Sequence, residues 1–314
     1  MAVYTEVPAE ALEAFLARYD TGRLVSAKGI AEGVSNSNFL VETETARYIL
    51  TLYERRIDLG DLPWFLAYME HLADGGQPVP RPIRDRQGEA LQQLEGKAAC
   101  LIQYLPGVSV SQPTASQARA AGVAMAEMHL GSAGFEAERP NTLSLAYWRE
   151  AAEELGERLD EIEPGLATTV AERIETVSAN WPSGLPRGTV HADLFPDNVL
   201  MLGDRVTGLI DFYFACTDYF AYDLAVLHAA WCFPADGSAP LPAHSEALME
   251  GYQSVRPLSA AELAAFPVLA QGASLRFLFS RAQDWLAPPS DALVQRKDPR
   301  PFARRLRHYA GLHG

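Results

Sequence analysis

The segment His191-Ala192-Asp193-Leu194-Phe195-Pro196-Asp197-Asn198 carries acids and an amide at fixed spacing, and Ile210-Asp211-Phe212 follows it. The pattern is H-x-D-x-x-x-x-N, an apolar run, a turn, a second apolar run and D-F. The two runs, residues 199–202 and 206–210, flank Gly203-Asp204, which favours a turn. A hairpin here is predicted to return Asp211 to the level of Asn198.

These residue types suit the transfer of a phosphoryl group to a hydroxyl. Such chemistry needs little covalent help, so a protein contributes mainly positioning and electrostatic stabilisation. Asp193 is predicted to accept the proton of the attacking hydroxyl, and His191 is grouped with it as catalytic. Asn198 and Asp211 offer the hard oxygen ligands that Mg²⁺ prefers. A lone aspartate is usually a solvated surface residue, so the prediction depends on the whole spaced group.

The spacing resembles the catalytic loop and metal-binding aspartate of protein kinases. A chain of 314 residues is long enough for two lobes with separate cores. We therefore expect an α+β, two-lobed, protein-kinase-like fold. An N-terminal lobe of antiparallel strands and a helix, residues 1–105, is expected to bind the nucleotide. A mainly helical lobe, residues 106–314, is expected to hold the catalytic and acceptor groups.

The composition limits the partners. The net charge is −14, so the basic surface typical of nucleic-acid binders is missing, and an acidic surface repels anionic membranes. Three scattered cysteines indicate reduced thiols. No signal sequence is visible at the N-terminus and no apolar run approaches a membrane span, so we expect a cytoplasmic protein.

The first lobe is expected to contain strands at residues 24–30, 39–43 and 47–53. A small polar turn lies between the first two, and its backbone N–H groups are suited to contact phosphate oxygens. The residues predicted to cover the phosphates are Gly33, Val34, Ser35, Asn36, Ser37 and Asn38.

The third strand departs from the kinase pattern, because Thr51 stands where a lysine for the nucleotide phosphates is expected. Lys28, or Arg55 and Arg56, are alternative sources of that charge, unless they are surface residues. Glu70, on a predicted helix at residues 62–73, is the candidate partner for such a cation.

An apolar strand at residues 98–105 leads to Pro106-Gly107, where we place the lobe boundary. In a two-lobed kinase the backbone of this linker reads the adenine edge. Gln103, Tyr104 and Leu105 are therefore predicted to contact the nucleotide.

The second lobe holds the acceptor candidates. His129 ends a predicted helix and Asp223 begins another, and both are expected to be structural. Tyr213 and Asp218 belong to an aromatic run after Asp211 and are candidates for the acceptor pocket. Arg276 and Arg281 lie on an apolar helix, where they either bind a substrate carboxylate or form structural salt bridges.

The motif 191–198 with 210–212 looks like the aminoglycoside phosphotransferase and choline kinase superfamily. Residues 29–39, 48–54 and 209–218 resemble its bacterial homoserine kinase branch, which also looks to carry threonine at the position of Thr51. This resemblance implies ATP and Mg²⁺ as cofactors, L-homoserine as acceptor, O-phospho-L-homoserine as product and a place in threonine biosynthesis.

Three alternatives stay open. The first is a kinase of the same fold acting on another alcohol, such as an aminoglycoside, choline or methylthioribose. The second is a non-catalytic pseudokinase, which the absent lysine allows. The third is metal-assisted phosphoester hydrolysis, which also uses clustered acids.

Overall fold

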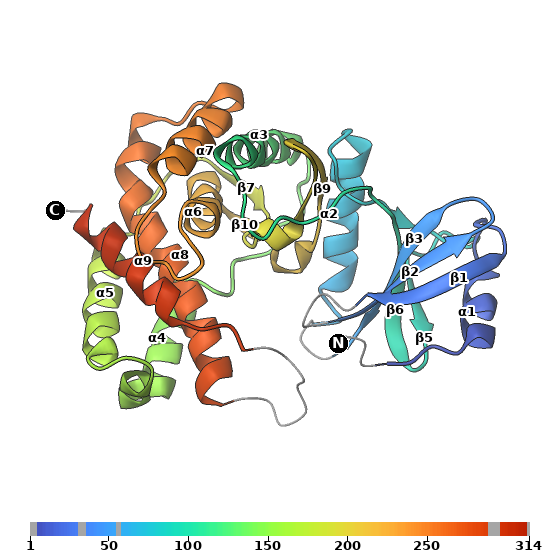
Figure 1. Cartoon of the computed structure of the whole chain (residues 1–314), viewed down its shortest axis with the longest axis horizontal. Helices are drawn as coiled ribbons and strands as arrows, with labels where there is room; N and C mark the ends of the chain where they lie inside the picture. The colour runs from blue at the N-terminus through green and yellow to red at the C-terminus, as the bar shows by residue number, and fades with distance from the viewer. Residues whose placement is uncertain (1–4, 31–35, 55–57, 288–295, 313–314) are drawn as a thin grey trace. The chain divides into compact units, whose positions relative to one another are not determined.

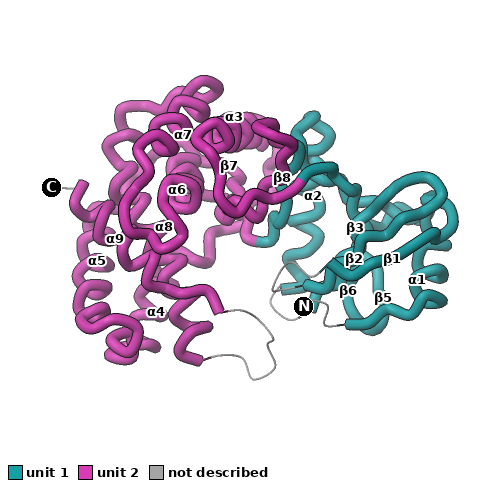
Figure 2. The backbone as a smooth tube through the Cα atoms, viewed as in Figure 1, with its two compact units in different colours: residues 1–107, 207–213 teal, residues 108–206, 214–314 magenta. Residues whose placement is uncertain are grey.

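The computed structural model describes residues 5–30, 36–54, 58–287 and 296–312, and the chain forms two compact units (Figure 2). Unit 1 comprises residues 1–107 and 207–213, and unit 2 comprises residues 108–206 and 214–314. The first division falls two residues beyond the boundary predicted after residue 105. The short segment 207–213 belongs to unit 1, although it follows residues 108–206 of unit 2 in sequence. A single boundary along the chain therefore does not separate the two units.

Unit 1 is built on one antiparallel sheet with strand order β1-β2-β3-β6-β4, in which β5 also pairs with β6 (Figure 1). The strands are β1 (Leu24–Ile30), β2 (Asn36–Thr43), β3 (Arg47–Tyr53), β4 (Pro82–Ile83), β5 (Leu91–Leu94) and β6 (Lys97–Gln103). The sheet confirms the antiparallel N-terminal lobe expected from the sequence.

Alternation along β3 gives the sheet two different faces. Leu50 and Leu52 are buried in an apolar cluster with residues of α1 (Ala9–Leu16). Residues of opposite parity on β3 reach other partners: the ring of Tyr53 lies edge-on to Tyr213, with centroids 5.3 Å apart. Tyr213 also meets Phe65 of α2 (Leu62–Asp74), at 5.8 Å between centroids.

Unit 2 is mainly helical, as expected. Its helices are α3 (Ala115–Gly131), α4 (Leu145–Leu155), α5 (Leu166–Asn180), α6 (Phe220–Trp231), α7 (Pro242–Val255), α8 (Ala260–Leu286) and α9 (Arg300–Gly311), with the short turns η1 (Gly156–Glu161), η2 (Pro196–Asn198) and η3 (Phe212–Phe214); η3 begins in unit 1. Helices α3 and α7 pack closely at Gly122, because glycine has no Cβ. A Cβ at this position would lie 2.3 Å from the Leu248 carbonyl oxygen. A larger residue at position 122 would force the two helices apart.

Helix α8 is the longest element, with 27 residues. By length and composition it is apolar enough to cross a membrane, although Gln271 and Arg276 interrupt its apolar run, and 67% of its most apolar window is buried in the structure. That burial is typical of a core helix. Its N-terminus is capped by Ser259, which accepts from the Glu262 N–H while the Glu262 carboxylate accepts from the Ser259 N–H.

Candidate active site

The segment 191–198 lies in unit 2, directly after β7 (Arg187–Val190). Strand β7 pairs antiparallel with β10 (Cys216–Tyr219), and Val190 lies opposite Cys216. After the strand the chain turns sharply, and Ala192 has a φ of 61°. A left-handed conformation costs a residue with a Cβ about 1–2 kcal/mol. Other contacts must therefore hold this turn.

The carboxylate of Asp223, on α6, supplies those contacts. Its Oδ2 accepts a hydrogen bond from the His191 N–H at 2.9 Å, and its Oδ1 accepts one from the Ala192 N–H at 2.7 Å. Nε2 of His129 lies 2.9 Å from the same carboxylate, and Nδ1 of His129 lies 2.8 Å from the Tyr252 hydroxyl. Asp223 and His129 are structural, as predicted, but their role is to shape the loop that carries Asp193.

The charge of this buried group resides on the aspartate. Burial alone would raise the pKa of Asp223, but hydrogen bonding from His129 and electrostatic interactions with His129 and His191 outweigh it, so the pKa is lowered. Burial lowers the pKa of His129 despite the attraction of Asp223. A neutral imidazole therefore donates to a carboxylate at neutral pH.

Asp193 is oriented by three groups. Its backbone N–H donates to Nδ1 of His191 at 3.2 Å. The Asn198 amide donates to the Asp193 carbonyl at 2.8 Å and to its carboxylate Oδ2 at 3.2 Å. The Arg276 guanidinium lies 3.8 Å from Oδ1. With 18% of its side chain exposed, Asp193 is fixed in place and still reachable from solvent.

His191 was predicted to be catalytic together with Asp193, and that role stays a prediction. Its side chain is completely buried, and its ring nitrogen is used by the Asp193 N–H. A side chain enclosed in this way is suited to position the loop that carries Asp193.

The two predicted metal ligands lie on different units. Asn198 ends η2 in unit 2, and Asp211 belongs to unit 1. Between them, β8 (Val199–Leu202) and β9 (Arg205–Leu209) form the predicted two-stranded hairpin. Asp211 is exposed and has a φ of 66°. No three His, Cys, Asp or Glu side chains among the described residues are grouped for a metal ion. The shared metal site stays a prediction.

Half of the predicted phosphate-binding turn can be placed. Gly33, Val34 and Ser35 lie outside the described residues, and Asn36, Ser37 and Asn38 begin β2. The Ser37 hydroxyl donates to Glu54 at 2.6 Å, and the Asn38 amide oxygen accepts from Thr51 at 2.8 Å. Both side chains are engaged within the sheet. The contact between backbone N–H groups of this turn and phosphates stays a prediction.

Thr51 stands at the position of the expected lysine, next to other residues with hydroxyl groups. Thr51 donates to Asn38, and the Tyr53 hydroxyl lies 2.8 Å from that of Tyr213 and 2.9 Å from the thiol of Cys100. This engagement gives Tyr213 a packing role in unit 1, which does not support its prediction as an acceptor residue.

Glu70, the proposed partner of a phosphate cation, forms a two-pronged ion pair with Arg84, whose Nη2 lies 2.5 Å from Oε2. Arg84 is half exposed and also donates to the Gly88 carbonyl. Glu70 is thus already paired, at the edge of the sheet, with an arginine that the sequence did not single out.

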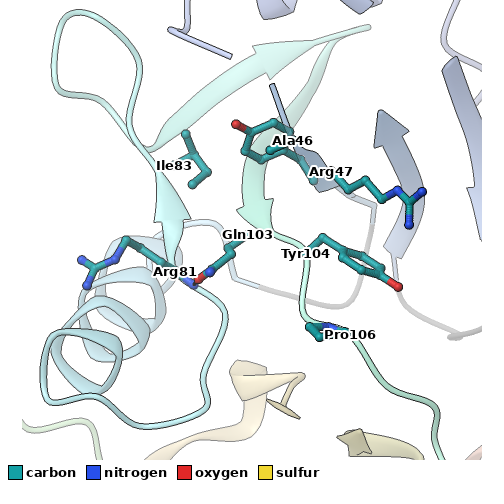
Figure 3. Close-up of a pocket in the computed structure, with 8 residues that line it drawn as sticks. Ala46, Arg47, Arg81, Ile83, Gln103, Tyr104 and Pro106 are labelled. Atoms are coloured by element: carbon teal, nitrogen blue, oxygen red, sulfur yellow. Dashed lines mark hydrogen bonds between the residues drawn. The ribbon is translucent and has the colours of Figure 1, made fainter. Parts of the chain in front are cut away.

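Of the predicted adenine contacts, Gln103 and Tyr104 line an open pocket of about 650 Å³ together with Tyr48 and Ile83 (Figure 3). Tyr48 and Ile83 pack on the α1 side of the sheet, so this hollow lies on the face opposite Thr51. The Gln103 side chain accepts from the Arg81 N–H at 3.3 Å. The predicted contact between the adenine and the backbone of Gln103, Tyr104 and Leu105 stays a prediction.

The remaining acceptor candidates all belong to unit 2. Asp218 is half-buried and accepts from the Asn141 amide at 2.7 Å and from the Tyr219 N–H at 2.7 Å. Burial raises its pKa against these hydrogen bonds. Arg276 and Arg281 both lie on α8. Arg276 donates to the Ala192 carbonyl, which links α8 directly to the loop that carries Asp193.

Comparison with known families identifies the chain. The phosphotransferase enzyme family matches residues 26–258, which include the whole segment 191–212 and all of the sheet of unit 1 except the first two residues of β1. The chain belongs to the phosphotransferase enzyme family. Membership of this phosphotransferase family makes the arrangement around Asp193 a candidate active site for transfer of a phosphoryl group.

Curated relatives in this phosphotransferase family cover nearly the full chain. A homoserine kinase of Azorhizobium caulinodans is 52% identical over 99% of this chain and 97% of its own length. A homoserine kinase of Gluconobacter oxydans is 52% identical over 98% of each chain.

Solved structures show the same fold at low sequence identity. An amicoumacin kinase, in complex with AMP-PNP and Ca²⁺, matches with a TM-score of 0.71 at 16% identity, over 96% of this chain and 93% of that one. A microcompartment-associated aminopropanol kinase matches with a TM-score of 0.67 at 19% identity, over 97% and 95% of the two chains. A choline kinase of Cryptosporidium parvum has a TM-score of 0.65 at 14% identity, over 91% and 88%. These likenesses confirm the predicted kinase-like fold.

Proposed function

We propose that the protein is an ATP-dependent kinase that phosphorylates the side-chain hydroxyl of L-homoserine, giving O-phospho-L-homoserine in threonine biosynthesis. The observation that carries this proposal is the identity of about half of all residues with homoserine kinases along almost the entire chain. The fixed and partly exposed Asp193 supports it, because an alcohol acceptor needs an oxygen that receives its proton.

In the proposed mechanism, Asp193 orients the acceptor hydroxyl and accepts its proton as the phosphoryl group is transferred in line. The Asn198 amide and the Arg276 guanidinium hold its carboxylate from two sides. Asp223 fixes the backbone of the preceding turn through the N–H groups of residues 191 and 192. The strained φ of Ala192 then presents Asp193 in one direction.

The donor chemistry of Asn198 and Asp211 fits a divalent cation. The Asn198 amide nitrogen is turned toward Asp193, and its Oδ1 accepts no hydrogen bond from the described residues. Asp211 is an exposed carboxylate held at a positive φ. Mg²⁺ is usually bound by one or two protein oxygens together with substrate phosphates. When bound, the ion would neutralise the charge that develops on the phosphate oxygens.

ATP is the proposed phosphoryl donor, and one structural neighbour contains its analogue AMP-PNP. We propose that backbone N–H groups of residues 33–38 contact the phosphates, and that the backbone of residues 103–105 reads the adenine. Thr51 carries no charge at the position where the protein-kinase pattern places a lysine, so the metal ion is expected to neutralise a larger share of the phosphate charge.

A panel of acceptors tests the proposed function. ADP release from ATP and Mg²⁺ would be followed with L-homoserine, choline, an aminoglycoside, methylthioribose and no acceptor. We expect rapid ADP release with L-homoserine, and kcat/KM values at least about 100-fold lower with the others, since the site's polar groups would be left unpaired. A preference for another alcohol would overturn the acceptor assignment, and equal ADP release without acceptor would favour hydrolysis.

A further inference from the structure

Two arginines on α8 differ in how they are engaged. Arg276 and Arg281 are five residues apart, which corresponds to about 7.5 Å along the helix axis. Arg276 is buried, donates to the Ala192 carbonyl, lies 3.8 Å from the Asp193 carboxylate and stacks over Phe277 at 4.5 Å. Its guanidinium is therefore committed to the catalytic loop.

Arg281 forms fewer polar contacts than Arg276. Its one hydrogen bond to a described residue goes to the backbone carbonyl of Asp298, at 3.1 Å. Its guanidinium lies over the ring of Phe302, 4.5 Å from the centroid. Among the described residues no carboxylate lies within ion-pair distance of it. Arg281 is partly buried. A partly buried guanidinium without a paired anion is less stable than a paired one, and a bound carboxylate would pair with it through two parallel hydrogen bonds.

The ring beneath Arg281 places it close to the catalytic loop, because the Phe302 ring lies 6.2 Å from the ring of Phe195, two residues after Asp193. Burial lowers the pKa of Arg281 to about 10, while the carboxylates of Asp193, Asp197 and Asp298 act in the opposite direction, with Asp193 the strongest of the three. The group therefore stays protonated at neutral pH and lies within electrostatic range of the catalytic aspartate. It is too far from that aspartate to form an ion pair with it.

A second cation, which is buried, strengthens the positive potential there. Arg305, on α9, lies over the same Phe302 ring, at 4.4 Å, and its Nε has no hydrogen-bond partner. Arg305 likewise forms no ion pair with a described residue. Together the two guanidinium groups and the buried Phe302 ring form a positively charged, partly apolar cluster in unit 2, in which Arg281 is the partly exposed member. Such a cluster is suited to a small anion attached to a short aliphatic chain.

We propose that Arg281 binds the carboxylate of the acceptor and so selects an amino-acid alcohol over amino alcohols that lack a carboxylate. This inference rests on the proposed function. In homoserine, three carbon atoms separate the hydroxyl oxygen from the carboxylate carbon, so these two atoms are about 5 Å apart in an extended molecule. If the homoserine hydroxyl lies at Asp193, its carboxylate can therefore reach the guanidinium of Arg281, which is near Asp193 but forms no ion pair with it.

The test compares two acceptors in Arg281→Gln and in the unsubstituted protein. One acceptor is L-homoserine, and the other is 3-aminopropan-1-ol, which is homoserine without its carboxylate. We expect kcat/KM for L-homoserine to fall about 10- to 100-fold in the variant, mainly through KM, because a charge-assisted pair made equally in ground and transition states is lost. The value for 3-aminopropan-1-ol, measured as turnover or as competition against homoserine, should change less than about twofold.

Two further variants make the result specific. Arg281→Lys keeps the charge but loses the planar fork, so we expect a smaller loss for L-homoserine and again none for 3-aminopropan-1-ol. Arg307→Gln removes a surface arginine of α9 that pairs with Glu163, and should leave both acceptors unaffected. Melting temperatures would verify folding, and Arg281→Lys serves if Arg281→Gln does not fold.

Equal losses for both acceptors, or no loss for L-homoserine, would overturn the role of Arg281. Failure of the proposed function is a separate outcome, because the unsubstituted protein itself would then show no homoserine-dependent ADP release.

Discussion

The carboxylate of Asp223 lies 2.9 Å from Nε2 of His129, and both side chains are fully enclosed in unit 2. The same carboxylate receives the backbone N–H groups of residues 191 and 192. A buried anion thus joins α3, α6 and the turn before Asp193. Because burial of an unpaired carboxylate is costly, the three hydrogen bonds hold these elements in one arrangement.

Asp223→Asn tests this arrangement. An amide presents one oxygen and one NH₂ group to three donors, so at least one buried donor loses its partner. We expect the free energy of unfolding to fall by about 3 kcal/mol and kcat to fall with it, while KM for ATP changes little. Urea unfolding and steady-state kinetics would measure both. The exposed Asp236→Asn serves as control, and an unchanged stability of Asp223→Asn would contradict the account.

Asp193→Asn tests the proposed base. The amide is similar in size to the carboxylate, so the fold and ATP affinity should be retained, but it cannot accept the acceptor's proton. We expect kcat to fall by about 10²–10⁴, as measured by ADP release with L-homoserine, with ATP binding checked by calorimetry. A variant that turns over within about tenfold of the unsubstituted protein would remove Asp193 from this role.

Arg276→Lys separates positioning from substrate binding. A lysine keeps the positive charge near Asp193 but cannot both donate to the Ala192 carbonyl and stack on Phe277 as a planar group. We expect kcat to fall about tenfold or more for L-homoserine and 3-aminopropan-1-ol alike, with nearly unchanged KM for L-homoserine. If instead only KM for L-homoserine rose, Arg276 would be a carboxylate ligand.

The pH dependence of stability should reveal His228. Burial, and to a smaller extent the charge of His308, lower its pKa from 6.5 to about 4. Because the unfolded chain binds the proton more tightly, the contribution is fully present above pH 6.5 and is lost as the pH falls toward 4, by about 3 kcal/mol.

Urea unfolding at pH 7 and at pH 4.5 would measure this loss. His228→Leu should be less sensitive to acid, even though it loses the contact between His228 and the Tyr309 hydroxyl. Equal acid sensitivity in both proteins would show that His228 does not titrate in this range.

The parts of the fold that rest on local patterns could be predicted. Strand β3 occupies the predicted residues 47–53, and α2 ends within one residue of its predicted end. In contrast, β7 and β10 were not predicted, because each has four residues and they pair across a long intervening segment. Only the part of α8 around Arg276 and Arg281 was predicted as a helix, although α8 begins at Ala260 and accommodates Pro267 in its interior.

Predictions for the site divide in the same way. The spacing around Asp193 indicated its chemistry, and its own hydrogen bonds to Asn198 are local. The group that holds the turn, Asp223, is separated from Ala192 by 31 residues, and no periodicity relates the two. Burial of His191 and the pairing of Glu70 with Arg84 likewise depend on tertiary packing, which sequence patterns do not show.

The central claim is that the protein transfers the γ-phosphoryl group of ATP to the hydroxyl of L-homoserine. Phosphorus NMR of protein, ATP, Mg²⁺ and L-homoserine follows every phosphorus species at once. We predict that a phosphomonoester signal, matching O-phospho-L-homoserine, grows in equal amount to ADP while the γ-phosphate signal of ATP declines. Growth of inorganic phosphate in place of the ester, or an unchanged ATP spectrum, would contradict the claim.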